Sequence, residues 1–94
     1  MRCVWDIQKA ESNKRKHGIS FAEAETVFDD TLAVIFDDEW HSQEEVREII
    51  IGHSDQNRLL LVCFTERANH VRIISAREAT LKERKDYEEN DESR

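Results

Sequence analysis

The sequence predicts an α+β domain in which two N-terminal helices precede a four-stranded antiparallel meander sheet and one C-terminal helix follows it. Two observations indicate this order. Apolar or capping residues recur at helical spacing near both ends of the chain, and four β-branched or apolar runs lie between them, separated by polar breaks. Helices segregated from an antiparallel sheet are typical of this class. The length of 94 residues predicts a single domain, 1–94.

The N-terminal part of the chain predicts a short extended lead-in and then two helices. Residues 2–7 have the composition of a short strand, and residues 8–17 that of a helix. The last turn of this helix is basic, and Gly18 follows it as the residue favoured at a left-handed helix end. Ser20 and Glu23 have the spacing of a capping box, which predicts that a second helix begins at once.

Four runs predict the strands of the sheet. They are residues 31–36, 46–53, 58–66 and 70–76. The breaks at 54–57 and 67–69 are short and turn-like, which predicts hairpins. Gly52, inside the second run, indicates a bulge or a turn.

The third strand and the last helix predict how the sheet is covered. Residues 58–66 are apolar on both alternating sides, so this strand is expected to be central and covered on both faces. A capping box of Ser75 and Glu78 predicts the last helix over about 76–90, and this helix has little apolar content. The first two helices are expected to cover one face, which leaves part of the other face open to a partner or substrate.

Charge is segregated along the chain. The net charge of −7 argues against a simple nucleic-acid binder. Segment 23–45, however, holds nine acids and no Lys or Arg, whereas segments 1–22 and 46–77 together hold ten bases against five acids. An acidic and a basic surface are therefore expected on one small fold, or else two solvated faces. The acidic segment either docks a basic partner or only aids solubility.

The sequence contains no apolar stretch of membrane-spanning length and no signal-peptide core at its start, which predicts a cytoplasmic protein without a membrane partner. Cys3 and Cys63 are interpreted as reduced, buried thiols. We expect no cofactor and no metal. His41 with Glu44 or Glu45 resembles a metal pair but lacks a third ligand nearby in the sequence.

Three arginines lie in or next to the last predicted strand. Strand alternation places Arg72 on the less covered face, with Arg67 and Arg77 near its rim. Guanidinium groups on such a face fit the binding of phosphate or carboxylate, because their fixed donors match both anions. The alternative is structural pairing of Arg72 with Glu48 or Glu66 across strands. Alternation alone does not decide between the two.

Several stretches together resemble the BrnT toxin family of bacterial toxin–antitoxin modules. They include "KHGISF", "RLLLVCFTER" and "VRIISAREATLKERKDY", and the resemblance covers residues 4 to 88. It implies a RelE-like ribonuclease fold and a metal-independent endoribonuclease that inhibits translation by cutting RNA. It also implies a BrnA-like antitoxin partner with a ribbon-helix-helix DNA-binding part. The toxin–antitoxin complex would repress its own operon, and the chain would meet operator DNA only through that complex.

Metal-free RNA cleavage requires a base for the 2′-hydroxyl, cations for the phosphorane and an acid for the leaving 5′-oxygen. The expected products are a 2′,3′-cyclic phosphate and a 5′-hydroxyl. We assign phosphate stabilisation to Arg72 and Arg77, with Arg67 close by. Arg77 is expected in the first turn of the last helix, where backbone amides would add to an anion site.

His17 is the first choice for proton transfer, because imidazole titrates near neutral pH. Its alternative is a cation at the helix C-terminus. Tyr87 would donate to the leaving group or stack on a base, and its alternative is a hydrophobic anchor of the last helix. Three further bases are expected to contact the RNA backbone: Lys14, Lys16 and Arg47.

Two other functions stay open at this level. One is a non-catalytic member of the same fold that binds a partner protein or an anion. The other is a DNA-operator module that acts through its complex. Incubation of the protein with RNA in EDTA separates the ribonuclease from the first of these.

Overall fold

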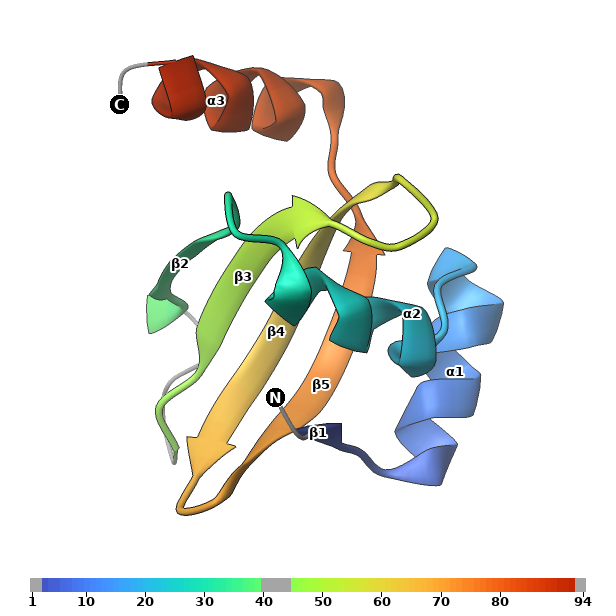
Figure 1. The fold of residues 1–94 in the computed structure, drawn as a ribbon. Helices are drawn as coiled ribbons and strands as arrows, with labels where there is room; N and C mark the ends of the chain where they lie inside the picture. The colour runs from blue at the N-terminus through green and yellow to red at the C-terminus, as the bar shows by residue number, and fades with distance from the viewer. Residues whose placement is uncertain (1–2, 40–44, 93–94) are drawn as a thin grey trace.

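The computed structural model describes residues 3–39 and 45–92, which form one five-stranded sheet, three α-helices and one short 3₁₀ helix (Figure 1). The elements in chain order are β1 (Cys3–Val4), α1 (Ile7–His17), α2 (Phe21–Thr26), the 3₁₀ helix η1 (Val27–Asp29), β2 (Val34–Asp37), β3 (Glu48–His53), β4 (Leu59–Arg67), β5 (His70–Glu78) and α3 (Leu81–Glu92). Helices α1 and α2 cover one face, and α3 lies across one end of the sheet.

The strand order of the sheet is β1-β5-β4-β3-β2. The predicted α+β class and the helix–helix–strands–helix order agree with this structure, but the four-stranded antiparallel meander is wrong. Strand β1 adds a fifth strand, parallel to β5, with Cys3 opposite Val71 and Val4 opposite Arg72. Two residues are too few for the alternation that identifies a strand in a sequence, and their pairing exists only once β5 is in place.

Helix α1 has a side-chain cap at its start and a glycine cap at its end. Asp6 Oδ1 accepts hydrogen bonds from the amides of Gln8 (2.8 Å) and Lys9 (3.1 Å). Gly18 adopts a φ of 72°, and its amide donates to the carbonyl of Lys14 at 2.9 Å. The predicted left-handed stop at Gly18 is therefore confirmed.

Helix α2 begins at the predicted N-cap, but only half of the capping box forms. The amide of Glu23 donates to Ser20 Oγ at 3.1 Å. The carboxylate of Glu23 pairs instead with the guanidinium of Arg58 and accepts a 2.6 Å hydrogen bond from Ser54 Oγ. The hydrogen bond from Arg58 lowers the pKa of this buried carboxyl group. The pair thus ties α2 to the β3–β4 hairpin.

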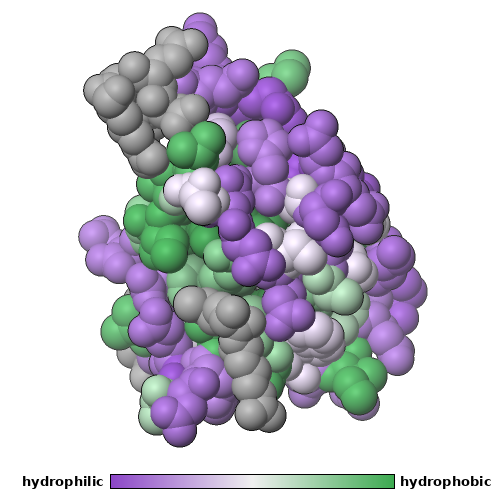
Figure 2. All heavy atoms as spheres, viewed as in Figure 1, coloured by the Kyte–Doolittle hydropathy of each residue, from purple (hydrophilic) through white to green (hydrophobic). Residues whose placement is uncertain are grey.

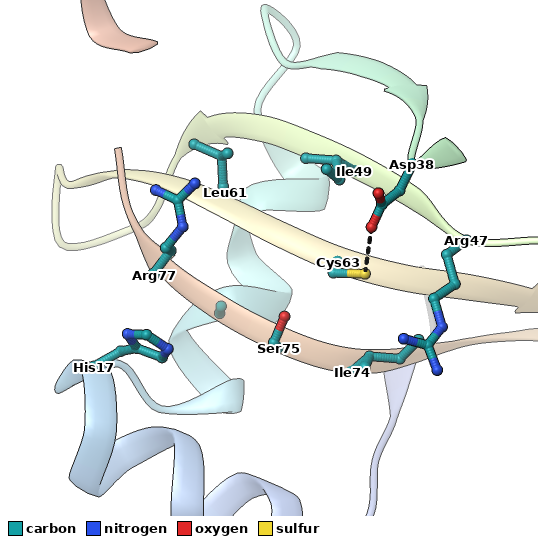
Figure 3. A pocket seen from close by; sticks show the side chains of 10 residues that line it. His17, Asp38, Arg47, Ile49, Leu61, Cys63, Ile74, Ser75 and Arg77 are labelled. Carbon is teal, nitrogen blue, oxygen red and sulfur yellow. Dashed lines mark hydrogen bonds between the residues drawn. The ribbon is translucent and has the colours of Figure 1, made fainter. Parts of the chain in front are cut away.

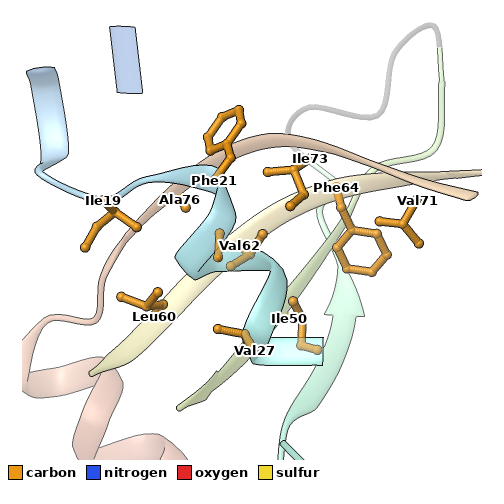
Figure 4. Close-up of a cluster of buried hydrophobic side chains, with 11 residues drawn as sticks. Ile19, Phe21, Val27, Ile50, Leu60, Val62, Phe64, Val71, Ile73 and Ala76 are labelled. Atoms are coloured by element: carbon orange, nitrogen blue, oxygen red, sulfur yellow. The ribbon is translucent and has the colours of Figure 1, made fainter. Parts of the chain in front are cut away.

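The core lies between α1, α2 and one face of the sheet (Figure 4). Its buried members are Ile19, Phe21, Ala24, Val27, Ile50, Leu60, Val62, Phe64, Val71, Ile73 and Ala76. The rings of Phe28 and Phe64 meet edge to face with centroids 5.1 Å apart. Removal of this apolar surface from water is the main force that holds the helices on the sheet.

The register between β4 and β5 shifts once, between Cys63 and Phe64. Phe64 is paired with Ile73 and Cys63 with Ser75, so Ile74 is the extra residue of a β-bulge. Beyond it the sides of β5 are exchanged: Ser75 joins the face opposite the helices and Ala76 enters the core. Simple alternation predicts the reverse.

The last helix begins later than predicted, and its cap is a different residue pair. Strand β5 continues to Glu78, and the amide of Ala79 still donates to the carbonyl of Leu59 at 2.9 Å. The capping box is Thr80 with Glu83: each amide donates to the other's side chain, at 2.9 and 3.1 Å. The predicted Ser75–Glu78 box is therefore wrong, because pairing with β4 keeps those residues extended.

Gly52 lies in a regular part of β3, paired with Leu60, and not at a bulge or turn as predicted. A Cβ added there would lie 2.8 Å from Ala33 Cβ and 2.9 Å from Asp30 Oδ2. Glycine is therefore required by the close approach of the η1–β2 connection. Among residues 3–39 and 45–92, no helix combines the length and apolar character that a membrane span requires.

Candidate functional site

A hollow of about 310 Å³ opens on the sheet face that α1 and α2 do not cover. We call it the main hollow. Its lining residues are His17, Asp38, Arg47, Ile49, Leu61, Cys63, Ile74, Ser75, Ala76 and Arg77. Figure 3 shows His17 and Arg77 at one end and Arg47 at the other, with Ser75 between them. A basic rim over a partly apolar floor suits an anion with an attached ring.

The bulge in β5 builds one wall of the main hollow. Because Arg77 is paired with Leu61 and Ser75 with Cys63, both side chains stand on the open face. The predicted location of Arg77 in the first turn of a helix is wrong, since it lies in the last part of β5. The amides at the start of α3 therefore do not surround it in the way expected from the sequence.

Helix α1 is fixed beside this wall by Asn13, a buried polar residue. Its Nδ2 donates to the carbonyls of Ala76 (2.8 Å) and Ile19 (3.0 Å), and its Oδ1 accepts from the amide of Ala76 (3.1 Å). The side-chain amide of Asn13 thus bonds the backbone of Ala76 in the way that a neighbouring strand would. It also holds His17, one helical turn further along, at the edge of the main hollow.

Arg77 is held by a bidentate ion pair. Its Nη1 and Nη2 donate to the two carboxylate oxygens of Glu83, both at 2.8 Å, and Nη1 also donates to the carbonyl of Glu78 at 3.2 Å. Three of the five N–H groups of the guanidinium are used in these bonds. The Arg77 hydrogen bond lowers the pKa of Glu83 to about 2, and Glu83 raises the pKa of Arg77.

Asp38 and Cys63 form a contact inside the main hollow. The Sγ of Cys63 lies 3.7 Å from Asp38 Oδ2 as a hydrogen-bond donor, and Asp38 is buried (Figure 3). Burial and the neighbouring carboxylate raise the pKa of the Cys63 thiol to about 11. The thiol is therefore protonated at neutral pH, which disfavours a nucleophilic role.

Arg67 and Arg72 stand on the same sheet face but meet a carboxylate there. Arg72 is paired with Thr65, and both arginines donate to Glu45, at 2.5 Å from Arg67 and 2.9 Å from Arg72. The Nε of Arg47 lies 3.8 Å from the same carboxylate. Neither Arg67 nor Arg72 lines the main hollow. The structure thus places the three predicted arginines on one face without joining them in one pocket.

The remaining predicted residues are placed as follows. Tyr87 is buried against Ile51 and Leu59, and its hydroxyl donates to the carbonyl of Leu32 at 3.2 Å. It lies outside the main hollow, and this arrangement matches the anchor that was its alternative. His41 and Glu44, of the candidate metal pair, lie outside the described residues.

The predicted backbone-contact residues divide between two sides of the molecule. Arg47 lines the main hollow itself. Lys16 lines a smaller hollow beside it, together with His17. Lys14 faces a separate apolar groove that also includes Trp5 and Ile7.

Sequence reasoning missed Asp38 and Ser75 as lining residues. Asp38 is one acid among nine in segment 23–45, and nothing in the sequence indicates that it is buried. Ser75 was interpreted as a helix cap. The signal that places Ser75 is the single register shift in β5, which strand pairing reveals and alternation does not.

Comparison with known proteins places the chain beside one family. The model of the family described as "Ribonuclease toxin, BrnT, of type II toxin-antitoxin system" matches residues 5–83. The crystal structure of the ribonuclease toxin BrnT from Brucella abortus is similar at 26% sequence identity with a TM-score of 0.65. The match covers 85% of this chain and 97% of that one. A search of curated protein sequences finds no match.

Proposed function

Because the chain belongs to the BrnT family of ribonuclease toxins of type II toxin–antitoxin systems, we propose that it is an endoribonuclease that cuts RNA at the main hollow. The cut would proceed without a metal ion, by attack of the 2′-hydroxyl on the adjacent phosphorus. The observation that carries this proposal is the meeting of His17, Arg77 and Arg47 around one hollow on the sheet face that α1 and α2 do not cover.

The proposed reaction balances without a cofactor. The 2′-oxygen forms a bond to phosphorus, the bond to the 5′-oxygen breaks, and a 2′,3′-cyclic phosphate and a 5′-hydroxyl result. His17 takes the proton of the 2′-hydroxyl, because among residues 3–39 and 45–92 it is the one imidazole at the rim of the main hollow. The protonated imidazole, or a water, then supplies the proton to the leaving 5′-oxygen.

Arg77 is the residue proposed to stabilise the phosphorane. Its pair with Glu83 orients the guanidinium, and two of its N–H groups have no acceptor in the hydrogen bonds described above. Donors held in place before charge develops cost no reorganisation during the reaction. Arg47 would contribute a second positive charge at the opposite end of the hollow. The apolar side chains of Ile49 and Leu61 would support the ribose or the base.

Arg67 and Arg72 are proposed to serve the RNA indirectly. Their shared carboxylate, Glu45, leaves less positive charge for a phosphate at that end of the sheet. An RNA strand that extends past Arg47 would bring a phosphate to these two arginines, and this phosphate would displace the carboxylate of Glu45. In this way the two arginines would hold flanking backbone and would not touch the reacting atoms.

The partner is proposed to be a BrnA-like antitoxin with a ribbon-helix-helix part that binds operator DNA and represses the operon. Half-exposed apolar side chains on the edge strand β2 and in the turn just before it support a protein partner: Leu32 at 50%, Ile35 at 51% and Phe36 at 46% exposure. Figure 2 shows apolar atoms gathered over this strand. Unpaired edges and apolar patches of this kind are usually covered by another chain.

The direct test is incubation of the purified protein with single-stranded RNA in excess EDTA. We expect cleavage, with mass spectrometry of the fragments giving 2′,3′-cyclic phosphate and 5′-hydroxyl ends. Fragments with 5′-phosphate ends would contradict the proposed chemistry. Expression of the protein alone is expected to arrest cell growth, because the toxin would inhibit translation in the cytoplasm. Co-expression of the neighbouring antitoxin is expected to restore growth.

One observation favours a second candidate, a non-catalytic member of the fold that binds a partner protein. Each predicted catalytic arginine already meets a carboxylate: Arg67 and Arg72 meet Glu45, and Arg77 meets Glu83. Under this candidate the pairs are structural and a partner covers the hollow. Intact RNA after prolonged incubation at high protein concentration would favour it over the ribonuclease.

A further inference from the structure

A second hollow, of about 190 Å³, adjoins the main hollow. We call it the side hollow. The two share three lining residues, His17, Ile74 and Ser75. The other residues of the side hollow all come from α1: Lys9, Ser12, Asn13 and Lys16. A chain-like ligand bound at His17 therefore meets this part of α1 as it leaves the main hollow.

The face of α1 that lines the side hollow is polar throughout. Lys9, Ser12, Asn13, Lys16 and His17 follow one another at intervals of three, one, three and one residue, which is the spacing of a single helical stripe. A stripe directed at a sheet is apolar where it builds a core. Here only Asn13 is buried, and it is consumed in anchoring the helix to Ala76. The rest of the stripe is available to a polar ligand.

The charge of the side hollow is uncompensated. No Asp or Glu lines it, and in the described parts of the chain neither Lys9 nor Lys16 forms an ion pair. Arg77, by contrast, is tied to Glu83. An anion entering the side hollow displaces no carboxylate. The two lysines lie seven residues apart, about 10 Å along the helix axis, so both can approach one phosphate between them.

We propose that the side hollow binds the phosphate next to the one that is cut, so that the RNA strand runs from Arg77 over Ser75 to Lys16 and Lys9. This inference rests on the proposed ribonuclease function and adds a subsite to it. Lysine acts there as a point charge, and Ser12 adds a hydroxyl donor. Contacts of this type position a strand without reading its sequence.

The test is binding of a fluorescent 2′-O-methyl RNA 12-mer, which lacks the attacking hydroxyl, measured by anisotropy at several salt concentrations. We expect Lys9→Ala/Lys16→Ala to weaken binding about tenfold and to reduce the slope of log K against log salt by about 0.7, the value for one lost single-strand phosphate contact. The matched control is Arg15→Ala, on the same helix but facing the separate apolar groove. All three side chains are exposed, so the fold is expected to persist, with circular dichroism as the check.

The subsite is overturned if the double variant binds as wild type, if Arg15→Ala loses as much affinity per charge, or if the wild-type protein binds no RNA. Cleavage separates this failure from failure of the proposed function. RNA cut equally well by wild type and the double variant removes the subsite and leaves the function. Lysine-dependent binding without any cleavage leaves the subsite and removes the function.

Discussion

Arg72 and Arg77 lie on the same face of strand β5 although they are five positions apart, because the register shifts once between their partners Thr65 and Leu61. In a regular strand, residues separated by an odd number of positions point to opposite faces. The bulge at Ile74 therefore decides that Arg77 borders the main hollow instead of entering the core. The candidate active site depends on this irregularity.

Replacement of Asn13 is expected to destabilise the fold. Asn13→Ala leaves the amide and carbonyl of Ala76 and the carbonyl of Ile19 without their side-chain partner inside the protein. Unpaired buried polar groups cost free energy, so we expect a loss of about 3 kcal/mol in the free energy of unfolding. Urea denaturation measures it, with Ser12→Ala on the exposed part of the same stripe as the control. Equal stability of the two variants would contradict the anchoring role.

Removal of the imidazole at the rim of the main hollow is expected to slow RNA cleavage without unfolding the protein. His17→Ala should lower kcat/KM about 100-fold or more, the scale of a lost general base. The pH–rate profile of the variant should contain one ionisation fewer than that of wild type. His70→Ala, in strand β5 but outside the hollow, is the control. An unchanged profile in His17→Ala would show that another group takes the proton.

The Arg77–Glu83 pair predicts a specific loss of stability in acid. Because the folded-state pKa of Glu83 is depressed from 4.5 to about 2, its contribution is fully present above about pH 4.5 and disappears as the pH falls toward 2. The difference in unfolding free energy between wild type and Glu83→Gln should therefore shrink across that window. Urea titrations at each pH measure it. The control is Glu88→Gln, exposed on the same helix, whose difference in unfolding free energy from wild type should not shrink in this way. A difference for Glu83→Gln that stays constant with pH would contradict the pairing.

Alanine is expected to destabilise the protein at both Gly18 and Gly52, but for different reasons. Gly52→Ala places a Cβ within 3 Å of Ala33 and Asp30, and overpacking of this kind costs about 1–3 kcal/mol. Gly18→Ala meets no atom within 4 Å but must adopt a φ of 72°, at a cost of about 1 kcal/mol. Combining Gly52→Ala with Asp30→Asn, which keeps the same volume, should not recover stability. Thermal denaturation of the variants tests this, and full stability of Gly52→Ala would show that the η1–β2 connection yields.

Helix ends were predictable from the sequence where one residue type decides them. Gly18 ends α1 and Ser20 caps the start of α2 as expected, because a left-handed glycine and a hydroxyl cap act locally. The start of α3 was not, since two possible capping boxes, "SARE" and "TLKE", follow one another within nine residues. Pairing with β4 keeps the first extended, and only tertiary structure supplies that fact.

The residue types of the candidate site are evident in the sequence, but their arrangement in space is not. The surplus of arginines near β5 and the imidazole before Gly18 follow from residue types alone. Which arginines meet was decided by the bulge at Ile74 and by Glu45 and Glu83, carboxylates that come from other segments. Asp38 entered the main hollow through its position at the end of β2, which the acidic composition of its segment concealed.

The most direct measurement is the rate at which Arg77 variants cleave single-stranded RNA in EDTA, with the folded fraction of each variant checked by its melting curve. We expect a loss of about 100-fold in kcat/KM for Arg77→Ala, the scale of one lost charge-stabilising donor. Arg77→Lys should recover part of it, because it restores the charge without the planar fork. Wild-type rates from well-folded Arg77→Ala would contradict the main hollow as the site of RNA cleavage.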